Sequence, residues 1–531
     1  MSSSGNPPTT SSAYAPFGQA AFALLWTATL ISNIGTWMHD VGAGWLMTTL
    51  NPSPAVVTLV QAATTLPVFC FALLAGALAD RLDKRRMLLG INMVLLVVIS
   101  LLTVLVWLEA MTPGLLIAFT LVIGTGAAFM APAWQAIVPQ LVPHVQLKPA
   151  IALNSMGINI SRAIGPAIAG ALIASVGLAA PFALNAVSFL VILTALTLWR
   201  PEKTERPRLT GSLLSDMATG LRHVRHNPAM LATAVRVAAF FLFASAYWAL
   251  LPLIARSAEG GGSTLYGALM ALIGAGAVTG AVLLPRLQRI ASSDAIVRIG
   301  TAGTALALIL MALAQIPMAL LAAAFVGGMS WIAVLTSLNV SAQTALPNWI
   351  RARGLAVFLM VFFGSMALGS ILWGQVAAAI SIAMALFIAA VGLGLGVVLT
   401  RKLPVSQGEA LDHSPASVWP EAPVHAEDQS EDQPAMVIVE YRIQPEHRGA
   451  FQNKMKSVAK ERLRNGATRW YIHQSVEEPE VWLETFYLRS WAEHLEHHGR
   501  VSVADMDLHQ DLRTLHQGPD APVVRHYIGS R

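Results

Sequence analysis

The chain contains about twelve apolar segments that are each long enough to cross a bilayer as an α-helix. Such a crossing takes about 20 predominantly apolar residues, because the hydrocarbon core is about 30 Å thick. The predicted segments are residues 21–47, 55–79, 87–108, 113–136, 151–175, 180–199, 229–254, 264–285, 295–315, 317–342, 353–378 and 381–401. Only 12% of the 531 residues are charged, whereas about 25% of a soluble protein is charged. The sequence therefore predicts an all-α polytopic membrane protein up to residue 402.

The cationic residues of this region lie in alternate connections. The connections of one side carry Arg81, Lys84, Arg85, Arg86, Lys148, Arg200, Lys203, Arg206, Arg208, Arg222, Arg225, Arg286, Arg289, Arg351, Arg353, Arg401 and Lys402, and those of the other side carry only Arg256. Because Lys and Arg in short loops stay on the cytoplasmic side, both termini are predicted to be cytoplasmic. The same clustering accounts for the net charge of +5 without a basic face for nucleic acid.

The apolar region has an internal repeat. A shift of 204 residues places Gly76 on Gly280, Gly124 on Gly328, Pro143 on Pro347, Gly165 on Gly369 and Gly170 on Gly374. We interpret residues 17–199 and 229–402 as two six-helix halves. A parallel repeat of this kind predicts a site near the bilayer midplane, where the halves meet.

The remaining residues have the composition of tails, linkers and one small domain. Residues 1–16 lack the cationic start of a signal peptide and are predicted to be a disordered cytoplasmic tail. Residues 200–228 are a polar linker with an amphipathic helix from Leu213, and residues 403–433 are a disordered linker. Residues 434–531 show the order βαββαβ, which predicts a ferredoxin-like α+β domain.

The connection GALADRLDKRR resembles the signature that the major facilitator superfamily carries between its second and third helices. The matching residues are Gly76, Leu78, Asp80, Arg81, Lys84, Arg85 and Arg86. Asp83 departs from the pattern, since many members have a second glycine there. The resemblance implies a transporter with 12 transmembrane helices in two halves.

Part of this signature predicts a conformational latch. Gly76 would permit close helix approach, and Asp80 could cap a helix or pair with a cation, with Arg81 and Arg85 beside it. Such contacts would form in one access state only. The alternative is that the cations only set the topology.

A second gating candidate lies in the fifth apolar segment. Gly165, Pro166 and Gly170, after Gly157, resemble part of the glycine-proline motif of drug/proton antiporters. Pro166 frees a backbone carbonyl, and the glycines allow tight packing, so the segment could bend or form a seal. Ordinary glycine-rich packing is the alternative.

Ionisable residues inside the apolar segments are the candidates for substrate binding and coupling, because each is costly in a membrane unless it is paired or hydrated. They are Asp40, His39, Arg162 and Arg236. Asp40 is the predicted proton carrier, and His39 could titrate near neutrality. Arg162 and Arg236 could bind an anionic or catecholate-like substrate or act as counter-ions to Asp40. The alternatives place His39 and Asp40 at the membrane interface and let Arg236 reach the cytoplasm.

Three stretches resemble the enterobactin-exporter-type group of this superfamily: SNIGTWMHDVGAGWLMTTL, GLRHVRHNP and SRAIGPAIAG. The resemblance implies export of a siderophore- or drug-like molecule from the bacterial inner membrane, with protons as coupling ion. Trp37, Trp45, Tyr247 and Trp248 could line the pathway or anchor at interfaces. The chain has no GxxxxGK[ST] motif, so we expect no ATP-driven transport and no cofactor.

The last domain resembles the dimeric antibiotic-biosynthesis-monooxygenase-like proteins, which implies a homodimer. Its histidines could suggest a metal site, but Glu493 and Glu496 make a solvated helix face the better interpretation, and we predict no metal. The histidines are His494, His497, His498, His509 and His516. Two alternatives to a plain exporter remain: a bifunctional protein whose domain modifies the compound, and a membrane ligand sensor.

Overall fold

The computed structural model describes residues 13–200, 213–314, 316–347, 349–405, 433–498, 506–517 and 520–529. The chain divides into two compact units. The first unit holds residues 1–211, 235–338 and 358–403, and the second holds residues 212–234, 339–357 and 404–531. The predicted N-terminal tail and the linker 403–433 lie almost entirely outside the described residues.

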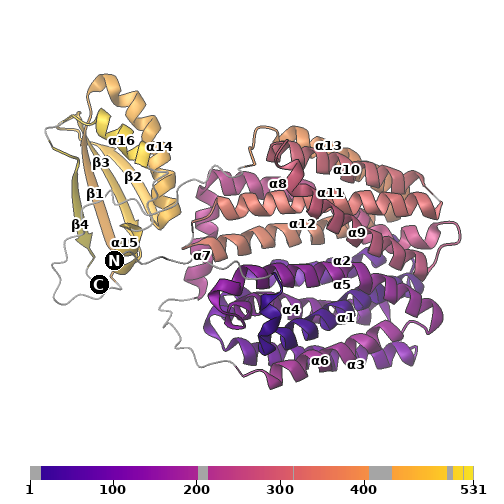
Figure 1. Ribbon diagram of the computed structural model, residues 1–531. Helices are drawn as coiled ribbons and strands as arrows, with labels where there is room; N and C mark the ends of the chain where they lie inside the picture. Colours follow the sequence, from indigo (N-terminus) through magenta and orange to yellow (C-terminus); the bar gives the residue numbers. More distant parts are fainter. Residues whose placement is uncertain are drawn as a thin grey trace, which may run out of the picture. The chain divides into compact units, whose positions relative to one another are not determined.

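Within the described residues, twelve helices are long and apolar enough to span a membrane, which confirms the predicted number. They are α1 (Ala20–Leu50), α2 (Pro54–Arg81), α3 (Lys84–Trp107), α4 (Pro113–Ile137), α5 (Leu147–Ser175), α6 (Ala180–Leu198), α8 (Pro228–Ser257), α9 (Ser263–Leu287), α10 (Ser293–Leu313), α11 (Pro317–Thr344), α12 (Arg351–Ala379) and α13 (Ile382–Thr400). Helices α1–α6 gather in one half of the bundle and α8–α13 in the other (Figure 1).

Short polar caps fix where several of these helices begin. The Asp83 carboxylate accepts a hydrogen bond from the backbone N–H of Arg86 at 3.0 Å and caps α3. Ser292 caps α10 and Ser381 caps α13 in the same way. Each cap satisfies a donor that a helix N-terminus leaves without an intrahelical partner.

Three of the four aligned glycine pairs lie at corresponding crossings of the two halves, which supports the repeat; the exception is Gly76, because only its counterpart Gly280 lies close to another helix. A Cβ on Gly124 of α4 would lie 3.0 Å from the carbonyl oxygen of Thr64 on α2, and Gly328 of α11 meets Ile273 of α9 in the equivalent way. Gly165 of α5 meets Trp37 of α1, and its counterpart Gly369 of α12 meets α8. In each pair the missing side chain lets two backbones approach, which is how small residues support packing in lipid.

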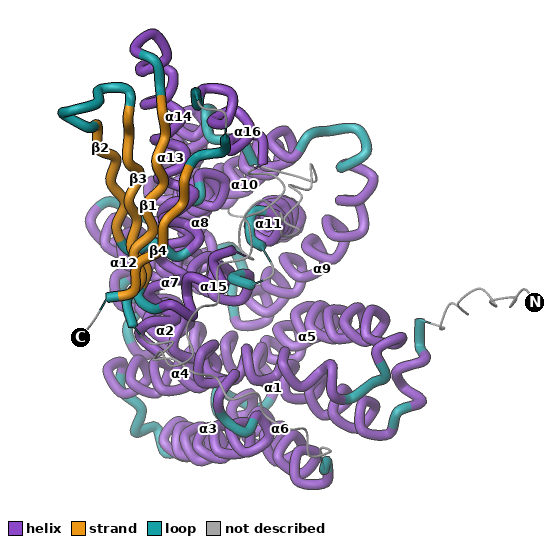
Figure 2. The backbone as a smooth tube through the Cα atoms, turned by 90° about the vertical axis from the view of Figure 1, so that its left-hand side faces the viewer, coloured by secondary structure: helices purple, strands orange, loops and turns teal. Residues whose placement is uncertain are grey.

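The second unit contains the small α+β domain. Its elements are β1 (Ala435–Arg442), α14 (Arg448–Asn465), β2 (Arg469–Gln474), β3 (Val481–Leu488), α15 (Trp491–His498), α16 (Met506–Leu515) and β4 (Val523–Ile528). The four strands form one antiparallel sheet in the order β2-β3-β1-β4 (Figure 2). The α+β prediction is confirmed, and the strands follow in the predicted order, but two helices, α15 and α16, stand where one helical stretch was predicted.

A charged network lies in the core of this domain. The Glu484 carboxylate on β3 accepts hydrogen bonds from Arg462 Nε, the Tyr441 hydroxyl and Trp470 Nε1, each at 3.0 Å. Arg462 also pairs with Glu461 at 3.3 Å. Burial raises the pKa of Tyr441, and the charge of Glu484 raises it further. The network joins α14 to the sheet, because buried charges are stable only when they are paired.

The predicted amphipathic linker helix is present as α7 (Leu213–His226), in the same unit as this domain. The buried His223 ring nitrogen Nδ1 lies 2.9 Å from the carbonyl oxygen of Arg464, at the end of α14. Arg222 pairs with Glu493 at 3.5 Å. Asn227 donates a hydrogen bond to the carbonyl oxygen of Ala345, just after α11. Helix α7 and Asn227, the residue after it, therefore contact both the domain and the connection between α11 and α12, where the His223 ring also lies edge-on against Trp349.

Candidate functional site

The two halves meet along two equivalent seams. A Cβ on Gly170 of α5 would lie 2.7 Å from the carbonyl oxygen of Ser263 and 3.0 Å from the Cα of Gly267, both on α9. A Cβ on Gly374 of α12 would lie 2.9 Å from the Cβ of Thr58 on α2. The predicted role of Gly170 in tight packing is thus supported by its position between the halves.

Further contacts join the halves where α1 ends and α9 begins. Arg256 of α8 donates a hydrogen bond to the carbonyl oxygen of Thr48. The rings of Trp45 and Tyr266 stack with centroids 6.2 Å apart. A Cβ on Gly44 would lie 2.7 Å from the Tyr266 hydroxyl. We call this region the Thr48 end of the bundle, and it is closed by these contacts.

Arg162 lies at mid-depth of α5, about 22 Å from Leu147 at 1.5 Å per residue, as the sequence predicted. Its guanidinium carbon lies 5.4 Å from the ring centroid of Trp37 on α1. It also interacts electrostatically with Tyr247 of α8, a residue of the other half. Within the described residues, Arg162 Nε is buried without a hydrogen-bond partner. A donor in this state is available to an acceptor on a ligand.

Asp40 and His39 are neighbours on α1 but face different surroundings. Asp40 interacts electrostatically with Tyr266 of α9, in the other half. The His39 ring is 2% exposed and packs edge-on against Phe182 of α6, with centroids 5.1 Å apart. Of the two, only Asp40 is brought toward the interface between the halves.

An aromatic cluster that the sequence analysis missed stands beside Tyr247 and Trp248. Trp331 of α11 lies with its ring centroid 5.8 Å from Tyr247 and 5.6 Å from Trp248, and 4.8 Å from Phe241. Phe362 of α12 stacks edge-on against Phe241 at 4.4 Å. The only available signal was the presence of aromatic residues inside apolar segments, which is too common to select these.

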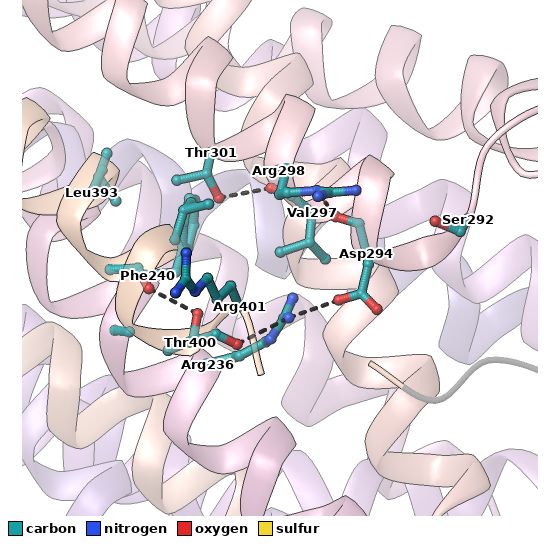
Figure 3. Close-up of a pocket in the computed structure, with 13 residues that line it drawn as sticks. Arg236, Phe240, Ser292, Asp294, Val297, Arg298, Thr301, Leu393, Thr400 and Arg401 are labelled. Atoms are coloured by element: carbon teal, nitrogen blue, oxygen red, sulfur yellow. Dashed lines mark hydrogen bonds and ion pairs between the residues drawn. The ribbon is translucent and has the colours of Figure 1, made fainter. Parts of the chain in front are cut away.

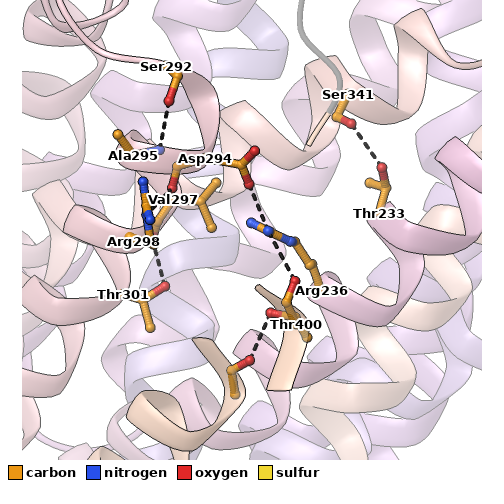
Figure 4. A network of polar contacts seen from close by, with 11 residues as sticks. Thr233, Arg236, Ser292, Asp294, Ala295, Val297, Arg298, Thr301, Ser341 and Thr400 are labelled. Carbon is orange, nitrogen blue, oxygen red and sulfur yellow. Dashed lines mark hydrogen bonds and ion pairs between the residues drawn. The ribbon is translucent and has the colours of Figure 1, made fainter. Parts of the chain in front are cut away.

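Arg236, which the sequence analysis offered either as a substrate-binding residue or as a counter-ion to Asp40, has a different acidic partner in the structure. Arg236 Nη2 lies 2.7 Å from Asp294 Oδ1 on α10 and donates to the carbonyl oxygen of Thr400 at 3.2 Å (Figure 4). Its ionic partner is therefore Asp294, an acidic residue in the first turn of α10 that the sequence analysis passed over. This arrangement is closer to the alternative in which Arg236 extends toward the cytoplasm, since it lies about two turns from the start of α8.

The latch predicted around Gly76 receives no support from helix packing. No described heavy atom comes within 4 Å of a Cβ built on Gly76, so the expected close approach is absent in this conformation. Arg85 donates from Nε to the carbonyl oxygen of Leu196 and from Nη2 to that of Thr197, each at 2.8 Å, and so caps the end of α6. The side chain of Asp80 lies outside the described residues, and Arg81 is the last residue of α2.

The histidines of the small domain are spread over separate environments. His494 and His526 lie with ring centroids 4.7 Å apart beside Trp491, whereas His509 faces Glu461 at 3.6 Å. His516 accepts a hydrogen bond from the backbone of Arg442. Among the described residues, no three His, Cys, Asp or Glu side chains are grouped as metal ligands would be. The side chains of His497 and His498 are outside the described part.

Comparison with known proteins decides the family. The profile of a family described as "transmembrane secretion effector" matches residues 11–531. The chain belongs to this family. The chain is thereby a multi-pass membrane protein of the major facilitator superfamily, which confirms the coarser of the resemblances drawn from its sequence.

Relatives of the chain include a staphyloferrin A transporter and a multidrug efflux pump. The chain is 26% identical over 263 residues to the staphyloferrin A transporter of Staphylococcus aureus, covering 48% of this chain and 64% of that protein. It is 27% identical over 368 residues to the multidrug efflux pump Tap of Mycolicibacterium fortuitum, and the match covers 67% of this chain and 88% of that pump. The match thus spans less than two thirds of the staphyloferrin A transporter.

Solved structures confirm the fold. An inward-facing, unoccupied bacterial homologue of the human lysosomal transporter Spinster gives a TM-score of 0.58 at 14% identity, covering 75% of this chain and 98% of that chain. An auto-inhibited POT family peptide transporter gives a TM-score of 0.59 at 12% identity, and the match covers 72% of this chain and 96% of that chain. At these identities the likeness concerns the fold alone.

Proposed function

We propose that the protein is a secondary transporter, not an enzyme, that exports a small organic molecule across the bacterial inner membrane by alternating access. The observation that carries this proposal is the position of Arg162 and Asp40. One lies at mid-depth of α5 and the other on α1, and each interacts electrostatically with a tyrosine of the opposite half. A pair of charges between two repeated halves is where a transporter of this architecture holds substrate and coupling ion.

The two charged residues have different tasks in this proposal. Asp40 is the proton carrier, because a carboxylate can exchange a proton when its surroundings change between the two access states. Arg162 keeps its charge in both states and binds the anionic or catecholate part of the substrate, with Trp37 supporting its guanidinium. His39 is assigned to packing between α1 and α6, since its ring lies against Phe182.

The proposed orientation follows from the charges. With cytoplasmic termini, the Thr48 end lies on the periplasmic side, and the contacts of Arg256, Trp45 and Gly170 close that side. The conformation would then be inward-facing, ready to receive substrate from the cytoplasm. Gly165, Pro166 and Gly170 act as the seal of this state.

The proposed substrate is siderophore- or drug-like. The relatives whose names refer to staphyloferrin A and to multiple drugs support this class, as do the three stretches that resemble enterobactin-exporter-type proteins. A ligand with carboxylate or catecholate groups fits Arg162, and flat apolar groups fit the aromatic cluster around Trp331.

The small domain is proposed to regulate transport and to dimerise. Regulation is favoured by the contacts of α7 with both Arg464 and the connection after α11. Dimerisation is favoured by the sheet face that does not carry α14. Four cross-strand neighbours follow one another across this face: Arg469, Tyr487, Met436 and Tyr527. Tyr487 is 37% exposed and Tyr527 is 43% exposed. Aromatic residues with adjacent arginines are frequent at interfaces between proteins.

Transport into inverted vesicles tests the proposal. Vesicles that contain the full chain should accumulate staphyloferrin A or a macrolide when a proton gradient is present and lose it when a protonophore is added. Accumulation should persist after deletion of residues 404–531. Binding of either probe without net flux would favour the sensor, and turnover of a catechol by residues 434–531 would favour the bifunctional protein.

A further inference from the structure

A cavity of about 330 Å³ lies between three helices of the second half, α8, α10 and α13 (Figure 3). Arg236 and Phe240 line it from α8, Asp294 and Arg298 from α10, Leu393 from the middle of α13, and Arg401 from the residue after that helix. Asp40 and Arg162 are not among its lining residues, so this is a different place from the proposed transport site.

The cavity carries a net positive charge. Three arginines and one aspartate give 3 − 1 = +2 among the lining residues. Arg236 and Asp294 form the inner ion pair, with Arg236 7% exposed and Asp294 35% exposed. Arg298 and Arg401 are exposed and stand at the rim. The guanidinium groups come from separate parts of the fold and face the same space (Figure 3).

The inner arginine still has an available donor. Arg236 uses Nη2 for both Asp294 and the carbonyl oxygen of Thr400. Its Nε is buried and has no hydrogen-bond partner among the described residues. A buried donor of a cation is costly when it is left unsatisfied, which favours an anionic acceptor in the cavity.

The walls and the neighbourhood of the cavity are apolar. Ala239, Phe240, Val297 and Leu393 form walls between the charged residues. Next to the rim, Ile299, Val398 and Leu399 are 57%, 56% and 72% exposed. On helices that span a membrane, such side chains face lipid tails. The cavity therefore lies at the lipid-facing side of the bundle, and Arg236 is only about 12 Å from the start of α8 at Pro228.

We propose that this cavity binds the phosphate group of an anionic phospholipid such as phosphatidylglycerol. Arg298 and Arg401 contact the phosphate oxygens, Arg236 Nε provides the inner donor, and the apolar walls hold the glycerol and the first methylenes of the acyl chains. A basic pocket between membrane helices, near their ends, is the environment in which anionic headgroups are recognised. A soluble phosphate shares the charge but lacks the acyl chains.

Native mass spectrometry of the full-length protein, purified in detergent and delipidated, tests this proposal. Dioleoyl phosphatidylglycerol, dioleoyl phosphatidylcholine and inorganic phosphate are titrated as separate probes. The expected result is binding of phosphatidylglycerol at least tenfold tighter than of phosphatidylcholine. The double variant Arg298→Gln/Arg401→Gln removes two exposed charges without disturbing the inner ion pair and should lose this preference. The matched control Arg289→Gln/Lys402→Gln removes two charges near the same helix ends, outside the cavity lining, and should keep it.

Three outcomes would overturn the proposal. Equal affinity for the two lipids would show that no headgroup is recognised. An equal loss in the rim variant and in the control would show that only general surface charge matters. Inorganic phosphate that competes with phosphatidylglycerol at similar concentration would assign the cavity to a soluble anion. A circular dichroism spectrum and thermal midpoint like those of the wild type ensure that a loss in the rim variant reports binding.

Discussion

Gly170 and Gly374 lie 204 residues apart and form equivalent crossings between the two halves, Gly170 with α9 and Gly374 with α2. The partner helices are themselves counterparts in the repeat. The halves are thus joined along two symmetry-related seams in which glycine allows backbone contact. Any rocking of one half against the other must change both seams.

A methyl group on either glycine should weaken the closed Thr48 end. In Gly170→Ala or Gly374→Ala the new Cβ would lie within 3.0 Å of neighbouring atoms, and overpacking of this kind costs about 1–3 kcal/mol. The population of the closed conformation should therefore fall roughly tenfold relative to the open one. Electron–electron distances between spin labels at Thr49 and Ser257, in a Cys70→Ser background, measure this shift.

Gly90→Ala and Gly394→Ala are the matched controls for this test. No described heavy atom lies within 4 Å of a Cβ at these positions, although both are inside helices. The controls should leave the distance distribution unchanged. A similar shift in the controls and in the seam variants would contradict the role given to the seams.

Replacement of Arg162 should affect substrate binding more than stability. Arg162→Ala removes both the charge and the contact with Trp37, and a charge-assisted hydrogen bond contributes about 1.5–3 kcal/mol. The Kd of an anionic probe should rise at least tenfold, as measured by isothermal titration. Arg162→Lys keeps the charge and should recover part of the affinity. Full affinity in the alanine variant would remove Arg162 from the site.

The buried network of the small domain should be essential to its stability. Arg462→Met leaves Glu484 and Glu461 buried without their cation, and loss of one partner of a buried pair costs about 3–5 kcal/mol. Urea unfolding of residues 434–531, followed by tryptophan fluorescence, measures the free energy of unfolding. Lys460→Met, an exposed control on α14, should change it by less than about 0.5 kcal/mol.

The same domain should lose stability in mild acid. Burial lowers the pKa of His526 and of His516 from the ordinary value of 6.5, so the unfolded chain binds protons more readily than the folded domain. The two neutral histidines are compatible with the folded domain above pH 6.5. As the pH falls through and below that value, protonation of the unfolded chain lowers the free energy of unfolding. The urea concentration at the unfolding midpoint should therefore be lower at pH 5 than at pH 7.5. This difference should be smaller in His526→Gln. A higher midpoint at pH 5 would reverse the predicted sign.

The fold was predictable because its signals are strong and repeated. Apolar length fixed the number of spans, and caps such as Ser292 and Asp83 place helix starts within a few residues of the predicted ones. The repeat of the two halves could be recognised from glycines that align at a shift of 204 residues, since close helix approach in lipid needs small residues. The α+β order was also readable from alternation, although a charged residue, Glu484, occupies a core-facing position of β3.

Partners of charged side chains were much less predictable. Arg236 and Asp294 are 58 residues apart, and nothing local indicates that α8 and α10 bring them together. His39 and Asp40 are adjacent in sequence, yet the helix directs them to Phe182 and Tyr266. Gly76 shows the limit of motif reasoning, because a motif records what a residue can do and one conformation shows only part of it.

Proton release during transport tests the central claim most directly. Inverted vesicles are acidified inside, and an acridine dye reports the gradient through quenching of its fluorescence. Addition of staphyloferrin A or a macrolide should restore fluorescence with the wild-type protein and with His39→Gln, because Asp40 carries the proton. With Asp40→Asn, which is inserted normally, fluorescence should stay quenched. Equal recovery of fluorescence with Asp40→Asn would contradict the account.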